Sequence, residues 1–153
     1  MTVDTTDFPR ILNEIKEEIQ PFFGKGKQAD YIPALANVPG DKFGMAVRTA
    51  DGQEFIVGDA KEDFSIQSIS KLFTLMQVLG LGDEDIWSRV GREPSGTAFN
   101  SLVQLEYNKG IPRNPLINAG AIVICDILIS HFEDTKTEIL NFIEQTNKEM
   151  QSL

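Results

Sequence analysis

The stretch from Asp63 to Gly80 constrains the fold most, because its apolar residues recur at helical spacing and a glycine closes it. Ser65 stands at the position of an N-cap, where a serine hydroxyl accepts a hydrogen bond from the first turn. The apolar positions that define the period are Ile69, Leu72, Phe73, Met76 and Leu79. The pattern predicts an amphipathic helix that begins after Ser65 and ends at Gly80.

Ser68 and Lys71 lie three residues apart near the start of this expected helix. That spacing places both side chains on one face, so the hydroxyl and the amine can meet. Ser-x-x-Lys is the arrangement of nucleophile and base in penicillin-recognising acyl-transfer enzymes. A plainer interpretation is that both residues are solvated on the polar side of the helix, and the tetrapeptide alone favours this one. The choice depends on what the neighbouring segments supply.

Length and charge restrict the classes of partner. The 153 residues suffice for one domain with a hydrophobic core. A net charge of −9 repels phosphate backbones and anionic lipid, so we expect no nucleic-acid partner and no membrane partner. The residues from Met1 to Asp7 have neither the basic nor the apolar region of a secretory signal. We therefore expect a cytoplasmic protein.

Cysteine and histidine usage argues against a metal site. Cys125 is the only cysteine and lies in the apolar run from Ile122 to Ile129, where we expect it to pack as a small hydrophobic side chain. His131 is the only histidine, so a cluster of Cys and His ligands cannot form. We expect no metal and no cofactor.

The first part of the chain predicts a helix followed by a hairpin. Apolar residues recur at helical spacing from Asp7 to Phe23, with Asp7 as the N-cap. Strand-like runs at Phe43–Ala50 and Gln53–Val57 flank Asp51-Gly52, a strong hairpin signal. Tyr31 stands in the connection between helix and hairpin, where we expect a half-buried aromatic ring.

The remainder is predicted to be helical. Asp83–Val90 indicates a short helix capped by Asp83, and Thr135–Lys148 a final amphipathic one. Between them, two prolines lead into a helix from Asn118 to Ser130, and Asn118 stands where an N-cap belongs. We find no internal repeat and no linker, so we expect a single domain.

Four segments together resemble the serine-dependent glutaminases, a family related in fold to the β-lactamases. The resemblance extends from the first helix to about Ile129. Four motifs in order are far more specific than Ser-x-x-Lys alone. The segments are Ala29-Asp-Tyr-Ile-Pro-Ala-Leu-Ala, Phe64-Ser-Ile-Gln-Ser-Ile-Ser-Lys, Glu93-Pro-Ser-Gly-Thr-Ala-Phe-Asn-Ser and Arg113-Asn-Pro-Leu-Ile-Asn-Ala-Gly-Ala-Ile.

The resemblance implies a role for each matching residue. Ser68 is the nucleophile that attacks the side-chain amide of L-glutamine, and Lys71 is the base that takes its proton. Lys71 must be neutral to act, which requires partial burial or nearby positive charge. Tyr31 reaches the reacting centre beside them, Asn118 binds substrate, and Gln67 belongs to the same substrate-binding motif as Ser68. The backbone N–H of Ser68 contributes to an oxyanion hole.

The resemblance also implies a mixed α/β (α+β) fold of the β-lactamase/transpeptidase type, of which this chain carries a part. Family members are about twice as long. We therefore expect one truncated domain, with the first helix and hairpin in residues 1–64 and the nucleophile helix and helical lobe in residues 65–153. The later substrate-binding residues, further tyrosines and last strands of the family have no counterpart here.

Two functions remain open at this point. The first is hydrolysis of L-glutamine through Ser68 and Lys71. The second is a catalytically inactive relative that pairs with a partner or with itself, and a homo-oligomer is expected because a lone hairpin leaves its edges unpaired. A β-lactamase or penicillin-binding protein lacks support, because neither Ser-Asp-Asn nor Lys-Thr-Gly occurs in the chain.

Overall fold

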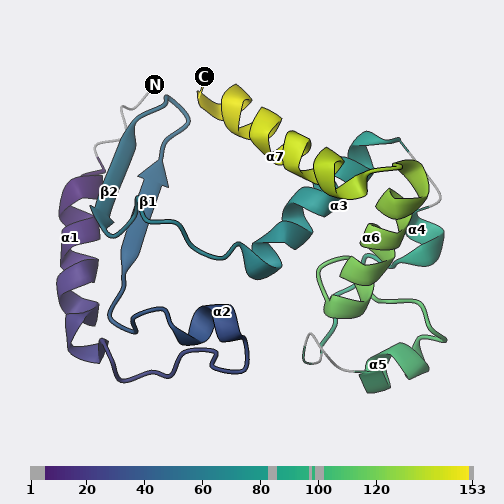
Figure 1. Cartoon of the computed structure of the whole chain (residues 1–153), viewed down its shortest axis with the longest axis horizontal. Coiled ribbons are helices and arrows are strands. Elements are labelled where there is room, and N and C mark those ends of the chain that lie inside the picture. Colours follow the sequence, from purple (N-terminus) through teal and green to yellow (C-terminus); the bar gives the residue numbers. More distant parts are fainter. Residues whose placement is uncertain (1–5, 83–85, 97, 99–101, 152–153) are drawn as a thin grey trace. The chain divides into compact units, whose positions relative to one another are not determined.

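The structure, a computed structural model, describes residues 6–82, 86–96, 98 and 102–151. The chain divides into two compact units, the first ending at Ser65 and the second beginning at Ile66. The regular elements among the described residues are helices and one two-stranded antiparallel sheet (Figure 1), so the mixed α/β class is confirmed.

The first unit consists of one long helix, two short ones and a hairpin. Asp7 caps the first helix as predicted, because its carboxylate accepts from the N–H of Arg10 at 3.1 Å. A four-residue helix that begins at Pro33 was not predicted; proline is favoured at that first helical position. The elements are α1 (Phe8–Ile19), η1 (Gln20–Phe22), α2 (Pro33–Ala36), β1 (Gly44–Arg48) and β2 (Glu54–Gly58).

The hairpin buries one face against α1, which lies alongside β2 (Figure 1). Alternation places Phe55 and Val57 on the covered face, where the ring of Phe55 stacks on Phe8 with the centroids 5.3 Å apart. Ile56 points to the opposite face and stays 44% exposed. Val57 pairs with Met45 in the register. The sheet is therefore covered on one side only by the described residues.

The second unit is helical, with a core in which α3, α4 and α6 meet. Its buried apolar residues are Val78, Ile86, Val90, Ile124, Ile127 and Leu128. The elements are η2 (Gln67–Ile69), α3 (Ser70–Gly80), α4 (Ile86–Arg89), α5 (Leu102–Tyr107), α6 (Asn118–His131) and α7 (Thr135–Gln151). The predicted helices in this region are confirmed, whereas α5 was not predicted. The expected cap Asp83 lies outside the described residues.

The helix that carries the Ser-x-x-Lys motif does not begin as predicted. Ser65 is not its N-cap; a 3-10 turn, η2, begins at Gln67 without a side-chain cap, and α3 follows it. The Ser70 hydroxyl donates to the carbonyl of Gln67 at 2.6 Å, which closes this turn instead. Gln67 itself has φ +39°, a left-handed conformation that costs an L-residue about 1–2 kcal/mol.

The last helix, α7, is capped from its N-terminal side by Asp134. One carboxylate oxygen accepts from the backbone N–H of Thr137 at 3.2 Å and the other from its hydroxyl at 2.7 Å. These hydrogen bonds lower the pKa of Asp134 below the usual 3.8, because they stabilise the ionised form.

Gln67→Gly should leave the free energy of unfolding unchanged or raise it by up to ~1 kcal/mol, because glycine adopts positive φ without strain. Gln67→Val should lower it by about 1–2 kcal/mol, since a β-branched residue is a strong outlier there. Gln20 opens the other 3-10 turn, and its φ is −50°. Gln20→Gly should therefore lower stability by about 0.5–1 kcal/mol. Urea unfolding measures all three, and a loss at Gln67→Gly as large as at Gln20→Gly would contradict the argument.

Asp134→Ala should destabilise the chain more at about pH 7 than at about pH 2. The folded-state pKa of Asp134 is depressed, so its contribution is complete above the unfolded-state pKa and is lost as the pH falls through the folded-state pKa. Urea unfolding of both proteins across this range measures the difference. Asp134→Asn keeps an acceptor oxygen but cannot ionise, so it should be less destabilised than Asp134→Ala, and its difference from the unchanged protein should shrink in acid by the same amount. If the difference in free energy of unfolding between Asp134→Ala and the unchanged protein stays constant down to about pH 2, ionisation of the carboxylate is not what stabilises the helix start.

Candidate active site

Lys71 and Asn118 meet where α3 packs on α6. The Lys71 Nζ donates a hydrogen bond to Asn118 Oδ1 at 2.7 Å, although the residues are 47 positions apart in the chain. This distance is at the short end of the range for an N–H···O bond. The structure thus brings together two of the five residues that the sequence singled out.

Asn118 is available for this contact because it is not the cap of its helix. The predicted N-cap role is wrong: Asn118 is the first residue of α6, and the cap position is occupied by Ile117, which makes no side-chain capping bond. Asn114 serves the start of the helix instead, since its Oδ1 accepts from the N–H groups of Leu116 and Ile117 at 3.0 and 3.1 Å. The side-chain amide of Asn118 faces Lys71.

A close backbone approach sets the position of this helix start. A Cβ on Gly120 would lie 1.9 Å from the carbonyl oxygen of Asn114, so only glycine allows the preceding loop to cross there. The Asn114 amide also donates to the carbonyl of Glu93 at 3.0 Å, and Glu93 N–H donates to Arg113 O at 2.8 Å. Two of the four motif segments are therefore joined. Asn114 and Gly120 were missed as site-forming residues, although glycine at the third position of a helix is a usable signal.

Ser68 lies in η2, one turn before Lys71, and its residue is exposed. Gln67 is exposed as well, and its positive φ sets the direction of the chain into Ser68. Strained residues of this kind are concentrated at functional sites. Contact between the Ser68 hydroxyl and the Lys71 amine stays a prediction.

Tyr31 belongs to the first unit, just before α2. Its side chain is 81% exposed, so the expected half-buried ring is wrong. An exposed tyrosine has no packing role within its own unit, which leaves its ring available for another surface. Its approach to Ser68 stays a prediction.

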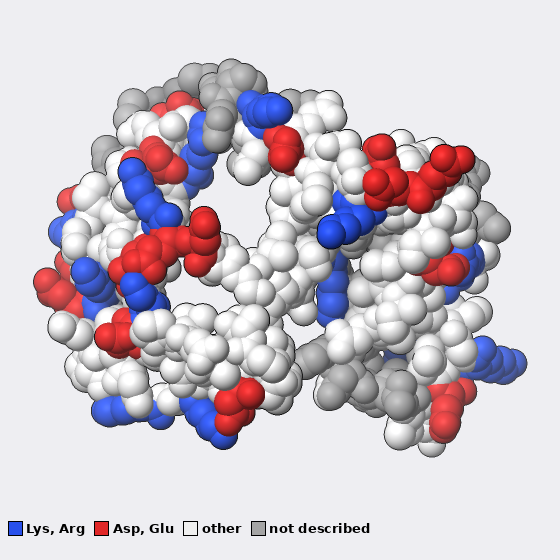
Figure 2. Space-filling view, in the orientation of Figure 1, with Lys and Arg blue, Asp and Glu red and all other residues white. Residues whose placement is uncertain are grey.

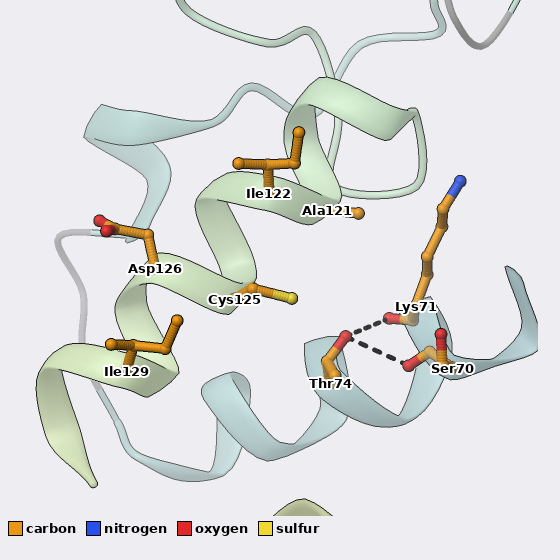
Figure 3. Close-up of a pocket in the computed structure, with 8 residues that line it drawn as sticks. All are labelled: Ser70, Lys71, Thr74, Ala121, Ile122, Cys125, Asp126 and Ile129. Carbon is orange, nitrogen blue, oxygen red and sulfur yellow. Dashed lines mark hydrogen bonds between the residues drawn. The ribbon is translucent and has the colours of Figure 1, made fainter. Parts of the chain in front are cut away.

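A groove of about 380 Å³ runs beside Lys71 between α3 and α6 (Figure 3). The Thr74 hydroxyl at its floor lies 3.2 Å from the carbonyl oxygens of Ser70 and Lys71, one of which accepts its hydrogen. The α6 wall is mainly apolar, formed by Ala121, Ile122, Cys125, Asp126 and Ile129. Cys125 is exposed in this wall, so its expected burial is wrong. Such a volume suits a small molecule.

The described residues contain no group of three or more His, Cys, Asp or Glu side chains that could hold a metal ion. The chemistry available from Ser68 in η2, Lys71 in α3 and Asn118 in α6 is that of a hydroxyl, an amine and an amide. An amine that donates one N–H to an amide oxygen keeps its lone pair, when neutral, for a proton from a nearby hydroxyl. This arrangement suits acyl transfer.

Comparison with known proteins identifies the family that this chain matches. The sequence model of the glutaminase family matches residues 26–152, which includes α7 and runs beyond the expected limit near Ile129. A glutaminase of Vibrio cholerae is 56% identical over 142 residues, which are 92% of this chain and 46% of the relative. A glutaminase of Paraburkholderia phytofirmans is 53% identical over 143 residues, 94% of this chain and 47% of that protein.

Solved structures agree with the sequence match. A probable glutaminase, YbaS, has a TM-score of 0.79 at 33% identity, with 92% of this chain and 46% of that chain covered. A probable glutaminase of Bacillus subtilis has a TM-score of 0.65 at 36% identity, covering 78% and 36%. The chain spans about half the length of the first of these structures and of both relatives. By this sequence match and this structural likeness, the chain belongs to the glutaminase family and carries part of its β-lactamase-like fold.

Proposed function

We propose that this chain supplies the nucleophile-bearing half of a site that hydrolyses L-glutamine to L-glutamate and ammonia. The observation that carries the proposal is the 2.7 Å hydrogen bond from Lys71 Nζ to Asn118 Oδ1, which joins two motif segments inside the family match. The relatives are glutaminases, which supports glutamine as the substrate.

In the first half of the reaction, the Ser68 hydroxyl oxygen attacks the side-chain amide carbon of glutamine while the neutral Lys71 amine takes the hydroxyl proton. The resulting tetrahedral oxyanion collapses, the C–N bond breaks, and Lys71 returns the proton to the departing nitrogen. Ammonia leaves, and the glutamyl group remains as an ester on Ser68. Asn118 holds Lys71 in position through the observed bond.

In the second half, water attacks the ester carbon and Lys71 accepts a proton from that water. The C–O bond to Ser68 then breaks, Ser68 regains a proton from Lys71, and glutamate leaves. We expect the N–H of Ser68, in the 3-10 turn before α3, to donate to the oxyanion, since N–H groups at the first turn of a helix lack an intrahelical acceptor. We expect Gln67 and Asn118 to contact the substrate, and the family resemblance assigns Tyr31 to the reacting centre.

The surface supports a small-molecule substrate rather than a polyanion. The net charge is −9, and the face shown in Figure 2 has basic and acidic side chains interspersed. Among the described residues, the helices are too short or too polar to cross a bilayer. The single cysteine is compatible with a reducing compartment, which supports a cytoplasmic location. Self-pairing of the chain, the homo-oligomer expected from the sequence, is one arrangement that could complete the site.

Ammonia release from L-glutamine tests this function. The purified chain is assayed alone and after co-expression with the C-terminal part of the Vibrio cholerae glutaminase, the part beyond its match to this chain. We expect release in the co-expressed preparation and its loss in Ser68→Ala, by at least about 10³-fold. The isolated chain should be slower by about 10²–10³ or more, because oxyanion donors are missing. Absence of release from both preparations, or release that survives Ser68→Ala, would refute the proposal and favour a non-catalytic interaction role.

Asn118→Asp should shift the rising limb of the pH–rate profile to higher pH. A carboxylate beside the Lys71 amine favours its charged form, which has no lone pair, so a smaller fraction of the enzyme is competent at neutral pH. We expect a loss of about 10²-fold at neutral pH that recovers partly in alkali. Asn118→Ser provides an uncharged control, which should lose activity without moving the limb. Equal profiles for both variants would show that Asn118 does not act on Lys71.

A further inference from the structure

The peptide unit between Gln67 and Ser68 carries both a hydrogen-bonded carbonyl and the expected oxyanion donor. Its oxygen is the carbonyl oxygen of Gln67, and its N–H is that of Ser68. Because a trans peptide unit is planar, its C=O and N–H point in opposite directions. Any group that holds the Gln67 carbonyl in place therefore also sets the direction of the Ser68 N–H.

Ser70 holds this carbonyl with two donors. Its hydroxyl donates to Gln67 O at 2.6 Å, and its backbone N–H donates to the same oxygen. The backbone bond of a 3-10 turn has poorer geometry than that of an α-helix, and Ile66 at the N-cap position of η2 makes no side-chain capping bond. The Ser70 hydroxyl thus adds a short, directional constraint to a turn that its backbone alone holds loosely.

The conformation of Gln67 requires such a constraint. Its φ of +39° is unfavourable for an L-residue and persists only where surrounding contacts enforce it. Packing on the turn does not enforce it, because none of the residues Gln67–Ile69 is buried within the described part of the chain. The hydrogen bonds that Ser70 donates to the Gln67 oxygen are contacts that can.

Ser70 is itself held from the following turn of α3. The Thr74 hydroxyl lies 3.2 Å from the carbonyl oxygens of both Ser70 and Lys71 (Figure 3), and Thr74 is only 6% exposed. The hydroxyls of Thr74 and Ser70 therefore connect the buried part of α3 to the exposed turn that carries Ser68.

We propose that Ser70 is a positioning residue for the oxyanion donor: its hydroxyl keeps the Gln67–Ser68 peptide oriented so that the Ser68 N–H faces the substrate carbonyl oxygen. The hydroxyl hydrogen of Ser70 is used on the Gln67 oxygen, so Ser70 acts through Ser68 and takes no part in making or breaking bonds. Adjacent residues on a helix do not face each other, so Ser70 is not directed at the Lys71 amine. The inference rests on the proposed function and adds to it a residue that the Ser-x-x-Lys motif does not include.

Ammonia release by the chain co-expressed with the C-terminal part of the Vibrio cholerae glutaminase measures the catalytic effect. Ser70→Ala should lower kcat by about 10–100-fold and change KM by less than about twofold, since a misdirected oxyanion donor costs less than the 10²–10³ of a missing one. The rising limb of the pH–rate profile should not move, because the Lys71 amine is unaffected. Ser70→Thr keeps a hydroxyl and should restore kcat to within about threefold.

Ser130 on α6 provides a matched control. Its hydroxyl also donates to a backbone carbonyl within its helix, that of Asp126 at 2.9 Å, but far along the chain from the nucleophile turn. Ser130→Ala removes the same kind of hydrogen bond and should change kcat by less than about twofold.

Proton NMR of the isotope-labelled chain alone tests the position of the peptide without turnover. The amide and α protons of one residue are closer at positive φ than in a helix, so the nuclear Overhauser effect between them at Gln67 reports its φ. We expect a strong effect in the unchanged chain and in Ser130→Ala, and a clearly weaker one in Ser70→Ala. The same spectra show whether each variant is folded.

Three results would overturn the proposal. An unchanged Overhauser effect at Gln67 in folded Ser70→Ala would show that other contacts fix the peptide. A loss of kcat as large as that of Ser68→Ala would make Ser70 a participant in the chemistry. A loss that Ser70→Thr does not restore would assign the effect to something other than the hydroxyl. If the unchanged co-expressed preparation releases no ammonia, the proposed function fails, while the Overhauser effect still decides whether Ser70 holds the peptide.

Discussion

The packing of α3 against α6 is the contact on which the second unit depends. Val78 and Leu128 are fully buried there, and both helices owe their covered faces to the same core. Burial of each such side chain contributes about 1.5–3 kcal/mol. The same packing brings Lys71 to Asn118, so the hydrophobic core and the polar site are consequences of a single helix–helix contact. Gly120 sets the start of α6, because any side chain there would collide with the carbonyl of Asn114 in the preceding loop.

Much of the fold could be predicted because its signals are local. Helical spacing located α1, α6 and α7, Asp7 acted as a cap, and Asp51-Gly52 separated two strands that do pair. For the site, spacing alone proposed Ser68 and Lys71 without deciding between chemistry and a solvated helix face. Asn118 lies 47 residues from Lys71, so no local pattern connects the two residues. Only the family resemblance assigned both of them to one site.

The errors have a common physical origin. Ser65 and Asn118 are good capping residues by type, but the chain closes these helix starts through Ser70 and Asn114. Burial of Tyr31 and Cys125 was inferred from their apolar character, yet burial depends on which surfaces arrive from elsewhere in the fold. The short helices α2 and α5 have too few residues to show a period.

The 3-10 turn from Gln67 to Ile69 has a consequence for how a preparation of this protein is judged. Ser68 sits outside the regular α-helix, in a turn with poorer hydrogen-bond geometry than the helix that follows. None of the three residues of the turn is buried, so it can open locally while the core around Val78 stays intact. A cooperative unfolding transition with an undiminished free energy of unfolding therefore reports on the core and not on the geometry of Ser68. A sample can be entirely native by that measure and still hold its nucleophile in the wrong geometry.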